Sequence, residues 1–191
     1  MTYPGTAGES ASLLRAAIFA ARIHATHRRK GMAAEPYVNH VLEVAQILAE
    51  HGAPHEAVLA GLLHDTVEDS DNDPEPITHA HLVAEFGETV ARIVAEATDD
   101  KSLPKETRKA LQVKHAPHKS DAAKMLKLAD KISNLRAIAA SPPANWEHAR
   151  RVEYVGWAGR VAAGLKGVNP ALEALFEATY RDAMARLAAE V

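Results

Sequence analysis

His64, Asp65, Glu68 and Asp69 place four side chains that can bind a metal or transfer a proton within six residues. The apolar residues before them have helical spacing, and neither Gly nor Pro occurs between residue 61 and the acidic loop at 70–73. Residues four apart are neighbours on a helix surface, so a continuous helix would put His64 and Asp65 one turn before Glu68 and Asp69. Two potential ligands would then lie beside two potential acid/base groups. The alternative is a solvated helix end, and this stretch alone does not decide between them.

Two further side chains could complete such a site. His40 lies in the first turn of a helix expected at 38–51, and a tight connection at 52–54 would bring that turn close to His64. Asp130 lies in a helix expected at 122–140, on the side opposite the apolar stripe, one turn before Asn134. A histidine or an aspartate in these positions is otherwise an ordinary surface residue, unless another layer of the fold covers it.

The chain contains no cysteine, so disulfides and thiolate metal sites are excluded, and any metal is held by histidines and carboxylates. His40, His64, Asp65 and Asp130 form a mixed nitrogen and oxygen set on three predicted helices. Such a set suits manganese, iron, zinc or magnesium, and residue types alone do not choose among these metals.

Basic side chains follow a separate pattern. Arg28, Arg29 and Lys30 are consecutive cations that can bind phosphates or stack on a base, or that simply complement the dipole of the preceding helix. Residues 61–100 hold eleven acidic side chains and one basic, whereas residues 101–131 hold nine basic and three acidic. These segments suit a metal beside a phosphorylated ligand, with a solvated face as the alternative. The net charge of -3 argues against general nucleic-acid binding.

The elements that must position these groups are helical, because apolar residues recur at helical spacing and no segment alternates as a strand does. We therefore expect an all-α, single-domain, multi-helix bundle over residues 1–191, with its core at about 12–166 and a C-terminal helix at about 171–189. The expected helices are 12–27, 38–51, one carrying His64, 79–86, 88–98, 104–114, 122–140, 145–165 and 171–189.

Trp146, Arg150 and Tyr154 are spaced four residues apart in the helix expected at 145–165. On one helix face they could hold an aromatic ring or a phosphate, although such a row is also typical of packing.

The start of the chain lacks the pattern of a signal peptide, and no apolar run approaches the roughly 18 residues of a membrane span. We expect a cytoplasmic protein without a membrane partner.

Five blocks of sequence carry a family resemblance. They are RRK with PYVNH at 28–40, LLHDTVED at 62–69, TDDK at 98–101, LQV with HAPH at 111–118, and KLADK with NL at 127–135. A His-Asp pair alone is common, but five blocks in this order are specific. They resemble the HD superfamily of metal-dependent phosphohydrolases, and within it the hydrolase domain of the RelA/SpoT family. The resemblance covers nearly the whole chain and is strongest to the stand-alone small alarmone hydrolases, including the metazoan SpoT homologues.

That resemblance implies roles for the clustered side chains. The metal ligands would be His40, His64, Asp65 and Asp130, usually for manganese, and Glu68 and Asp69 would position and deprotonate the attacking water. A divalent metal lowers the pKa of bound water, and carboxylates one helical turn away can take its proton. The substrate-binding residues would be Arg28, Arg29, Lys30, Asn134, Lys101, Arg150 and Tyr154.

The resemblance also implies a reaction, which is hydrolysis of the 3′-diphosphate of guanosine tetraphosphate or pentaphosphate. Removal of the 2′-phosphate of NADPH at the same site is one alternative, and a non-catalytic alarmone-binding module is another. The chain departs from many relatives at Val41, where they have Pro, and at Ser133, where they have Tyr. Neither departure removes a ligand or an acid, but both bear on substrate preference. The oligomeric state stays open.

Overall fold

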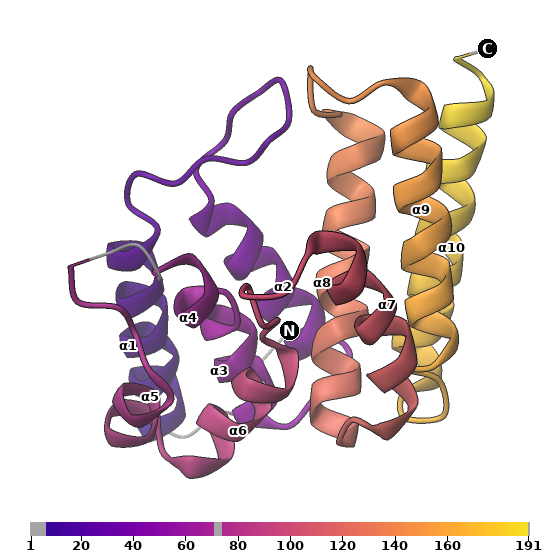
Figure 1. Ribbon diagram of the computed structural model, residues 1–191. Helices are drawn as coiled ribbons and strands as arrows, with labels where there is room; N and C mark the ends of the chain where they lie inside the picture. Colours follow the sequence, from indigo (N-terminus) through magenta and orange to yellow (C-terminus); the bar gives the residue numbers. More distant parts are fainter. Residues whose placement is uncertain (1–6, 71–73, 191) are drawn as a thin grey trace.

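A computed structural model describes residues 7–70 and 74–190, so the middle of the expected acidic loop, at 71–73, lies outside the described residues. The described chain is all-α, as predicted, and its β contacts are two isolated bridges, Arg28 with Pro36 and Gly31 with Pro143 (Figure 1). The helices are α1 Ala7–Ile23, α2 Val38–Glu50, α3 His55–Leu63, α4 Thr66–Asp69, α5 His79–Phe86, α6 Glu88–Ala97, α7 Lys105–His115, the 3₁₀ turn η1 Ala116–His118, α8 Asp121–Ala140, α9 His148–Ala163 and α10 Pro170–Ala188.

Helix α8 is the central element of the bundle. It packs against α2, α3 and α6 on one side and against α9 and α10 on the other (Figure 1). Its expected apolar stripe, which includes Leu128 and Ile132, is fully buried. The opposite side is covered as well, so Lys127, Asp130 and Lys131 are buried polar residues. The side of α8 that could have faced solvent therefore faces the interior.

Close packing of α2 against α3 depends on a small residue. A Cβ added to Gly61 would lie 2.8 Å from Leu48 Cδ1 and 3.3 Å from Ala45 Cα. The glycine lets the two backbones approach, which brings the beginning of α2, with His40, close to the end of α3.

The expectation of one helix running unbroken past His64 is wrong. Helix α3 ends at Leu63, and α4 begins only at Thr66. Two side chains donate hydrogen bonds to backbone carbonyl oxygens near the break. His64 Nδ1 donates to the Gly61 carbonyl at 2.9 Å, and the Thr66 hydroxyl donates to the Leu63 carbonyl at 2.7 Å. The one-turn spacing of the acidic groups survives, since the Asp69 N–H still donates to the Asp65 carbonyl at 2.8 Å.

The start of α9 also differs from the prediction. The helix begins at His148 with Glu147 as its N-cap, not after Asn145. The Trp146 N–H donates to the Pro143 carbonyl at 3.0 Å, which closes a turn before the helix. Trp146 therefore belongs to this loop, and the helical row predicted for Trp146, Arg150 and Tyr154 is incomplete.

Helix α1 covers Ala7–Ile23 and not the predicted 12–27, whereas the remaining helix boundaries agree within two residues. Gly87, with φ of 85°, separates α5 from α6 as expected, and the Ser120 hydroxyl caps α8 by accepting from the Ala123 N–H. None of the helices in the described ranges is both long enough and apolar enough to cross a membrane.

Candidate metal centre and active-site cavity

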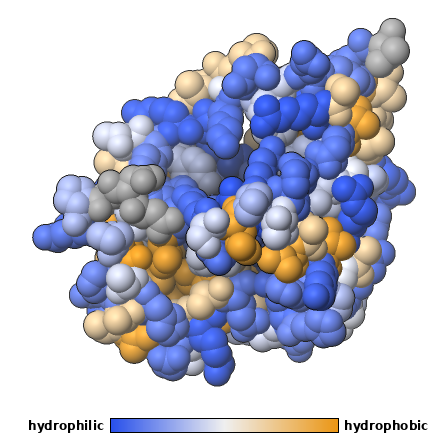
Figure 2. Space-filling view, viewed as in Figure 1, coloured by the Kyte–Doolittle hydropathy of each residue, from blue (hydrophilic) through white to orange (hydrophobic). Residues whose placement is uncertain are grey.

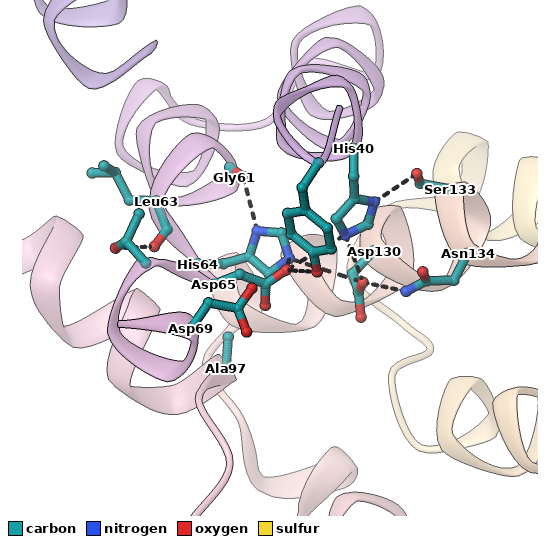
Figure 3. A network of polar contacts seen from close by, with 12 residues as sticks. His40, Gly61, Leu63, His64, Asp65, Asp69, Ala97, Asp130, Ser133 and Asn134 are labelled. Carbon is teal, nitrogen blue, oxygen red and sulfur yellow. Dashed lines mark hydrogen bonds and ion pairs between the residues drawn. The ribbon is translucent and has the colours of Figure 1, made fainter. Parts of the chain in front are cut away.

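Four side chains from three parts of the fold meet beside α8. His40 comes from α2, His64 and Asp65 from the junction of α3 and α4, and Asp130 from α8 (Figure 3). His40 Nε2 lies 3.6 Å from Asp65 Oδ2 and 3.4 Å from Asp130 Oδ1. His64 Nε2 lies 3.1 Å from Asp65 Oδ2 and 3.9 Å from Asp130 Oδ1. These separations suit atoms that share one ion at about 2.0–2.2 Å.

Hydrogen bonds on the far sides of both rings orient the histidines. His64 Nδ1 bonds to the Gly61 carbonyl, so Nε2 is left with its lone pair facing the carboxylates. His40 Nδ1 lies 2.8 Å from the Ser133 hydroxyl, which itself donates to Glu43 at 2.6 Å. Because that hydroxyl donates its proton to Glu43, it accepts a hydrogen bond from His40 Nδ1. His40 Nε2 then carries a lone pair and is also available as a ligand.

The surroundings of His64 provide a test of whether a metal fits. Its Nε2 atom is buried and has no hydrogen-bond partner among the described residues. Burial disfavours a charge on this ring, but the carboxylates of Asp65 and Asp130 outweigh burial and raise its pKa to about 9. The field of the two carboxylates thus favours a positive charge at this point. A divalent metal would supply that charge and use the unpartnered nitrogen, and the hard and borderline donors suit it.

Both carboxylates of the cluster are held ionised. Burial opposes the charge of Asp130, but the Lys131 ammonium at 3.0 Å keeps its pKa well below the usual range. Asp130 Oδ1 also accepts from Asn134 Nδ2 at 2.6 Å. The adjacent His64 keeps the pKa of Asp65 low despite burial, and Asp65 Oδ2 accepts from the Tyr37 hydroxyl at 2.7 Å.

The two acids predicted for catalysis, Glu68 and Asp69, lie on α4 next to this cluster. Burial, followed by the negative charge of Asp65, raises the pKa of each carboxyl. Two cations face them: Arg108 lies 3.7 Å from Glu68 Oε1, and Lys101 lies 3.7 Å from Asp69 Oδ1 while donating to the Glu68 carbonyl. Both carboxylates reach the cavity and are available to accept a proton.

A cavity of about 550 Å³ opens above these groups, and it forms the hollow among hydrophilic side chains in Figure 2. Its size is that of a small-molecule site. One wall is acidic and comes from the metal cluster and α4, and the opposite wall is basic and aromatic and comes from the loops before α2 and α9. The lining residues among the predicted site are Arg28, Arg29, Lys30, Asp65, Glu68, Asp69, Lys101, Asn134 and Tyr154.

The three consecutive cations do not have equivalent positions. Arg29 donates to Asn134 Oδ1 at 3.2 Å, and its guanidinium lies 5.9 Å from the centre of the Tyr37 ring. Arg28 instead donates to the carbonyls of Ala25 and His27, at 3.2 and 2.9 Å. Arg29 is therefore connected to the metal cluster through Asn134, whereas Arg28 stabilises its own loop.

Arg150 is not brought into this cavity. It lines an adjoining hollow of about 320 Å³, where its guanidinium lies 4.3 Å from the centre of the Trp146 ring. Tyr154 borders both spaces, and its ring centre lies 5.4 Å from that of Trp146. Arg150 thus contacts Trp146, a residue that borders both spaces, and does not itself line the larger cavity.

Sequence reasoning missed several residues of this site. Sequence spacing assigns Tyr37 no role of its own, yet its hydroxyl donates to Asp65 Oδ2 at 2.7 Å. Its position three residues before His40, with an aromatic ring and a hydroxyl, was a usable signal. Ser133 and Glu43 were not assigned roles because their contacts with His40 join helices that are distant in sequence. His27 was treated only as a helix end, although it lines the cavity.

Comparison with known proteins gives a consistent result. The HD domain family matches residues 16–158 of the chain. A guanosine-3′,5′-bis(diphosphate) 3′-pyrophosphohydrolase, MESH1, from Xenopus tropicalis is 47% identical over 91% of this chain and 96% of its own length. The human protein of the same name is 48% identical over 86% of this chain and 90% of its own.

Two solved structures extend the comparison. One, described as a metazoan ortholog of SpoT that hydrolyzes ppGpp, has a TM-score of 0.84 at 38% identity and covers 95% of this chain and 97% of its own. A protein from Listeria monocytogenes EGD-e has a TM-score of 0.64 at 31% identity and covers 78% of this chain and 99% of its own.

Proposed function

The chain belongs to the HD-domain family, and on that premise we propose that it is a manganese-dependent guanosine-3′,5′-bis(diphosphate) 3′-pyrophosphohydrolase. The reaction consumes one water. Its oxygen attacks the phosphorus attached to the ribose 3′-oxygen, the bond between that phosphorus and the 3′-oxygen breaks, and the 3′-oxygen takes up a proton. Guanosine tetraphosphate yields GDP and pyrophosphate, and the pentaphosphate yields GTP and pyrophosphate.

The observation that carries this proposal is the juxtaposition of three groups in one cavity. The cluster of His40, His64, Asp65 and Asp130 lies beside two carboxylates of raised pKa, and cations line the facing wall. Hydrolysis of a phosphate ester needs a Lewis acid, a proton acceptor and a site for the remaining negative charge. Relatives that share nearly half of the residues over almost their whole length carry the name of this activity.

In this proposal the four clustered side chains would hold a single divalent metal, for which manganese is the proposed ion. When bound, that metal supplies the Lewis acidity that lowers the pKa of water and neutralises charge on phosphate oxygens. Glu68 and Asp69 orient the water and accept its proton, for which their ionised forms are required. Tyr37 holds Asp65 in position through its hydroxyl.

The remaining wall binds the nucleotide. Arg29 and Lys30 offer charged donors to phosphate oxygens, and Asn134 is placed between Arg29 and Asp130 to orient the ribose side of the ester. Lys101, held at the Glu68 carbonyl, brings a cation to the acidic side of the cavity. Trp146 and Tyr154 provide flat apolar surface for a base.

The test uses metal-stripped protein incubated with guanosine tetraphosphate, with and without manganese, while GDP and pyrophosphate are measured. NADPH is incubated in parallel, and Glu68→Gln serves as the control for a contaminating phosphatase. The proposal predicts manganese-dependent release of both products by the unaltered protein alone. Turnover of NADPH without guanosine tetraphosphate would assign another substrate to the same site, and turnover of neither would favour a binding module.

A further inference from the structure

A second cluster of metal-binding side chains lies on the cavity wall, outside the four residues described above. His24 at the end of α1, His27 in the following loop and Asp69 on α4 each direct one donor atom to a common point, with all three atoms within 4.8 Å of one another. His24 Nδ1 lies 3.1 Å from His27 Nδ1 and 3.8 Å from Asp69 Oδ2. The first cluster has the same range of spacings, from 3.1 to 3.9 Å.

A hydrogen bond between the two imidazoles accounts for only part of this arrangement. It would use one proton and two nitrogens, and it leaves Asp69 Oδ2 at 3.8 Å, which is too far for a hydrogen bond to His24. The other carboxylate oxygen of Asp69, Oδ1, lies 3.7 Å from Lys101 Nζ. Three potential metal-ligand atoms thus lie close together, while the carboxylate oxygen makes no hydrogen bond to either ring. This arrangement is expected when the space between the three atoms can hold a cation.

The burial and orientation of the His24 ring suit a metal ligand. Its ring is buried, and its Nε2 atom has no partner within the described part of the chain, so Nδ1 is the atom through which the ring makes polar contact. The lone pair that a metal requires would come from this nitrogen, which lies 3.1 Å from His27 Nδ1 and 3.8 Å from Asp69 Oδ2.

We propose that His24 Nδ1, His27 Nδ1 and Asp69 Oδ2 form a second divalent-metal site on the wall of the cavity. Two imidazoles and one carboxylate, with further positions open to water or phosphate oxygens, suit zinc, manganese, iron or cobalt rather than magnesium or calcium, which prefer oxygen ligands. The two metals would be linked through α4, since Asp65 of the first site and Asp69 of the second are one helical turn apart.

The effect that this second metal would have on catalysis rests on the proposed function. A second cation facing the cavity would neutralise part of the charge of a substrate with several phosphates. It would also engage Asp69 as a ligand, which leaves Glu68 as the principal proton acceptor. Neither His24 nor His27 has another role in the proposed mechanism, and His27 lines the cavity.

The test counts bound metal directly. Cobalt serves as the probe because it binds nitrogen and oxygen sites more tightly than manganese and has an absorption spectrum. Metal-stripped protein is saturated with cobalt, separated from free ion by gel filtration and analysed for cobalt per chain. We expect two equivalents for the unaltered protein, and one each for His27→Gln and His64→Gln. The matched control, His118→Gln, changes an exposed histidine and should keep two.

Anomalous diffraction from cobalt-loaded crystals of the unaltered protein gives a second readout, independent of whether any variant folds. A peak bounded by His24, His27 and Asp69 supports the site. One equivalent in the unaltered protein, or a second peak elsewhere, overturns it. Pyrophosphate release is measured in parallel on manganese-loaded protein from the same metal-stripped batch. One cobalt per chain with full manganese-dependent hydrolysis rejects the second site alone, whereas two cobalts per chain without manganese-dependent hydrolysis reject the proposed function alone.

Discussion

The Ser133 hydroxyl of α8 lies 2.8 Å from His40 Nδ1 of α2. The same hydroxyl donates to Glu43 at 2.6 Å, so a chain of hydrogen bonds runs from a half-buried carboxylate through a buried hydroxyl to a proposed metal ligand. Such partners fix the tautomer and the orientation of a ligating histidine.

Ser133→Ala should therefore weaken metal binding by about 10–100-fold, because it removes the partner that orients His40. The measurement is the dissociation constant for manganese, obtained by titration of metal-stripped protein. Ser102→Ala, which changes an exposed hydroxyl bonded to Asp100, is the control. Equal affinity in Ser133→Ala and the unaltered protein would show that His40 needs no such partner.

Glu68→Gln should reduce hydrolysis by about 10²–10⁴-fold, since the amide cannot accept the proton of the attacking water. The variant should still bind metal at the first cluster, because Glu68 contributes no atom to that cluster. Steady-state rates and metal content are measured on one preparation, with the exposed Glu88→Gln as control. Retained turnover in Glu68→Gln would remove this residue from the mechanism.

The pH dependence of the reaction should reflect Lys101. Burial and the charge of Asp65 raise the pKa of Glu68, whereas the cation of Lys101 lowers it. A base acts only when ionised, so activity falls as the pH drops through this pKa. In Lys101→Met the pKa rises further, and the acidic limb of kcat should move to higher pH. The measurement is kcat at saturating manganese over a pH series, with the exposed Lys114→Met as control. The prediction is contradicted if the acidic limb of Lys101→Met stays where it is in the unaltered protein, or if the acidic limb of Lys114→Met moves by the same amount.

Arg28 and Arg29 offer a matched pair of adjacent cations. Arg29→Ala should raise KM by about 10–100-fold, because a charge-assisted hydrogen bond contributes about 1.5–3 kcal/mol and this guanidinium reaches the cavity beside Asn134. Arg28→Ala should change KM much less, since its guanidinium is bonded to two carbonyls of its own loop. Equal effects of the two substitutions on KM would reverse this assignment.

Two helical glycines should respond in opposite ways to alanine. Gly61→Ala should lower the free energy of unfolding by about 1–3 kcal/mol, because the added methyl meets Leu48 and the backbone of Ala45 between α2 and α3. Gly156→Ala in α9 should be neutral or stabilise by up to about 1 kcal/mol, since the nearest atom, Arg160 Nη1, lies at 3.7 Å. Denaturant unfolding midpoints measure both, and a stabilised Gly61→Ala would mean that the helices separate freely.

Much of the fold was predictable because helix formation leaves local signals. Ser120 at a cap, Gly87 between α5 and α6, and the apolar stripe of α8 all act within a few residues, so spacing and residue type are sufficient to locate these elements. The absence of cysteine likewise limits any metal ligands to nitrogen and oxygen donors. The four predicted ligands could be named from the sequence, although their convergence needed the packing of α2, α3 and α8.

Tertiary structure alone decided the features that depend on contacts between distant residues. The break between α3 and α4, the burial of Asp130, and the different directions of Arg28 and Arg29 follow from competition for carbonyls, cover by neighbouring helices and the fold of one loop. The approach of His24 to Asp69 joins positions 45 residues apart (69 − 24). Sequence spacing describes neighbours along one helix, whereas a metal site is a property of side chains that packing brings together, and only the packed structure specifies which atoms meet.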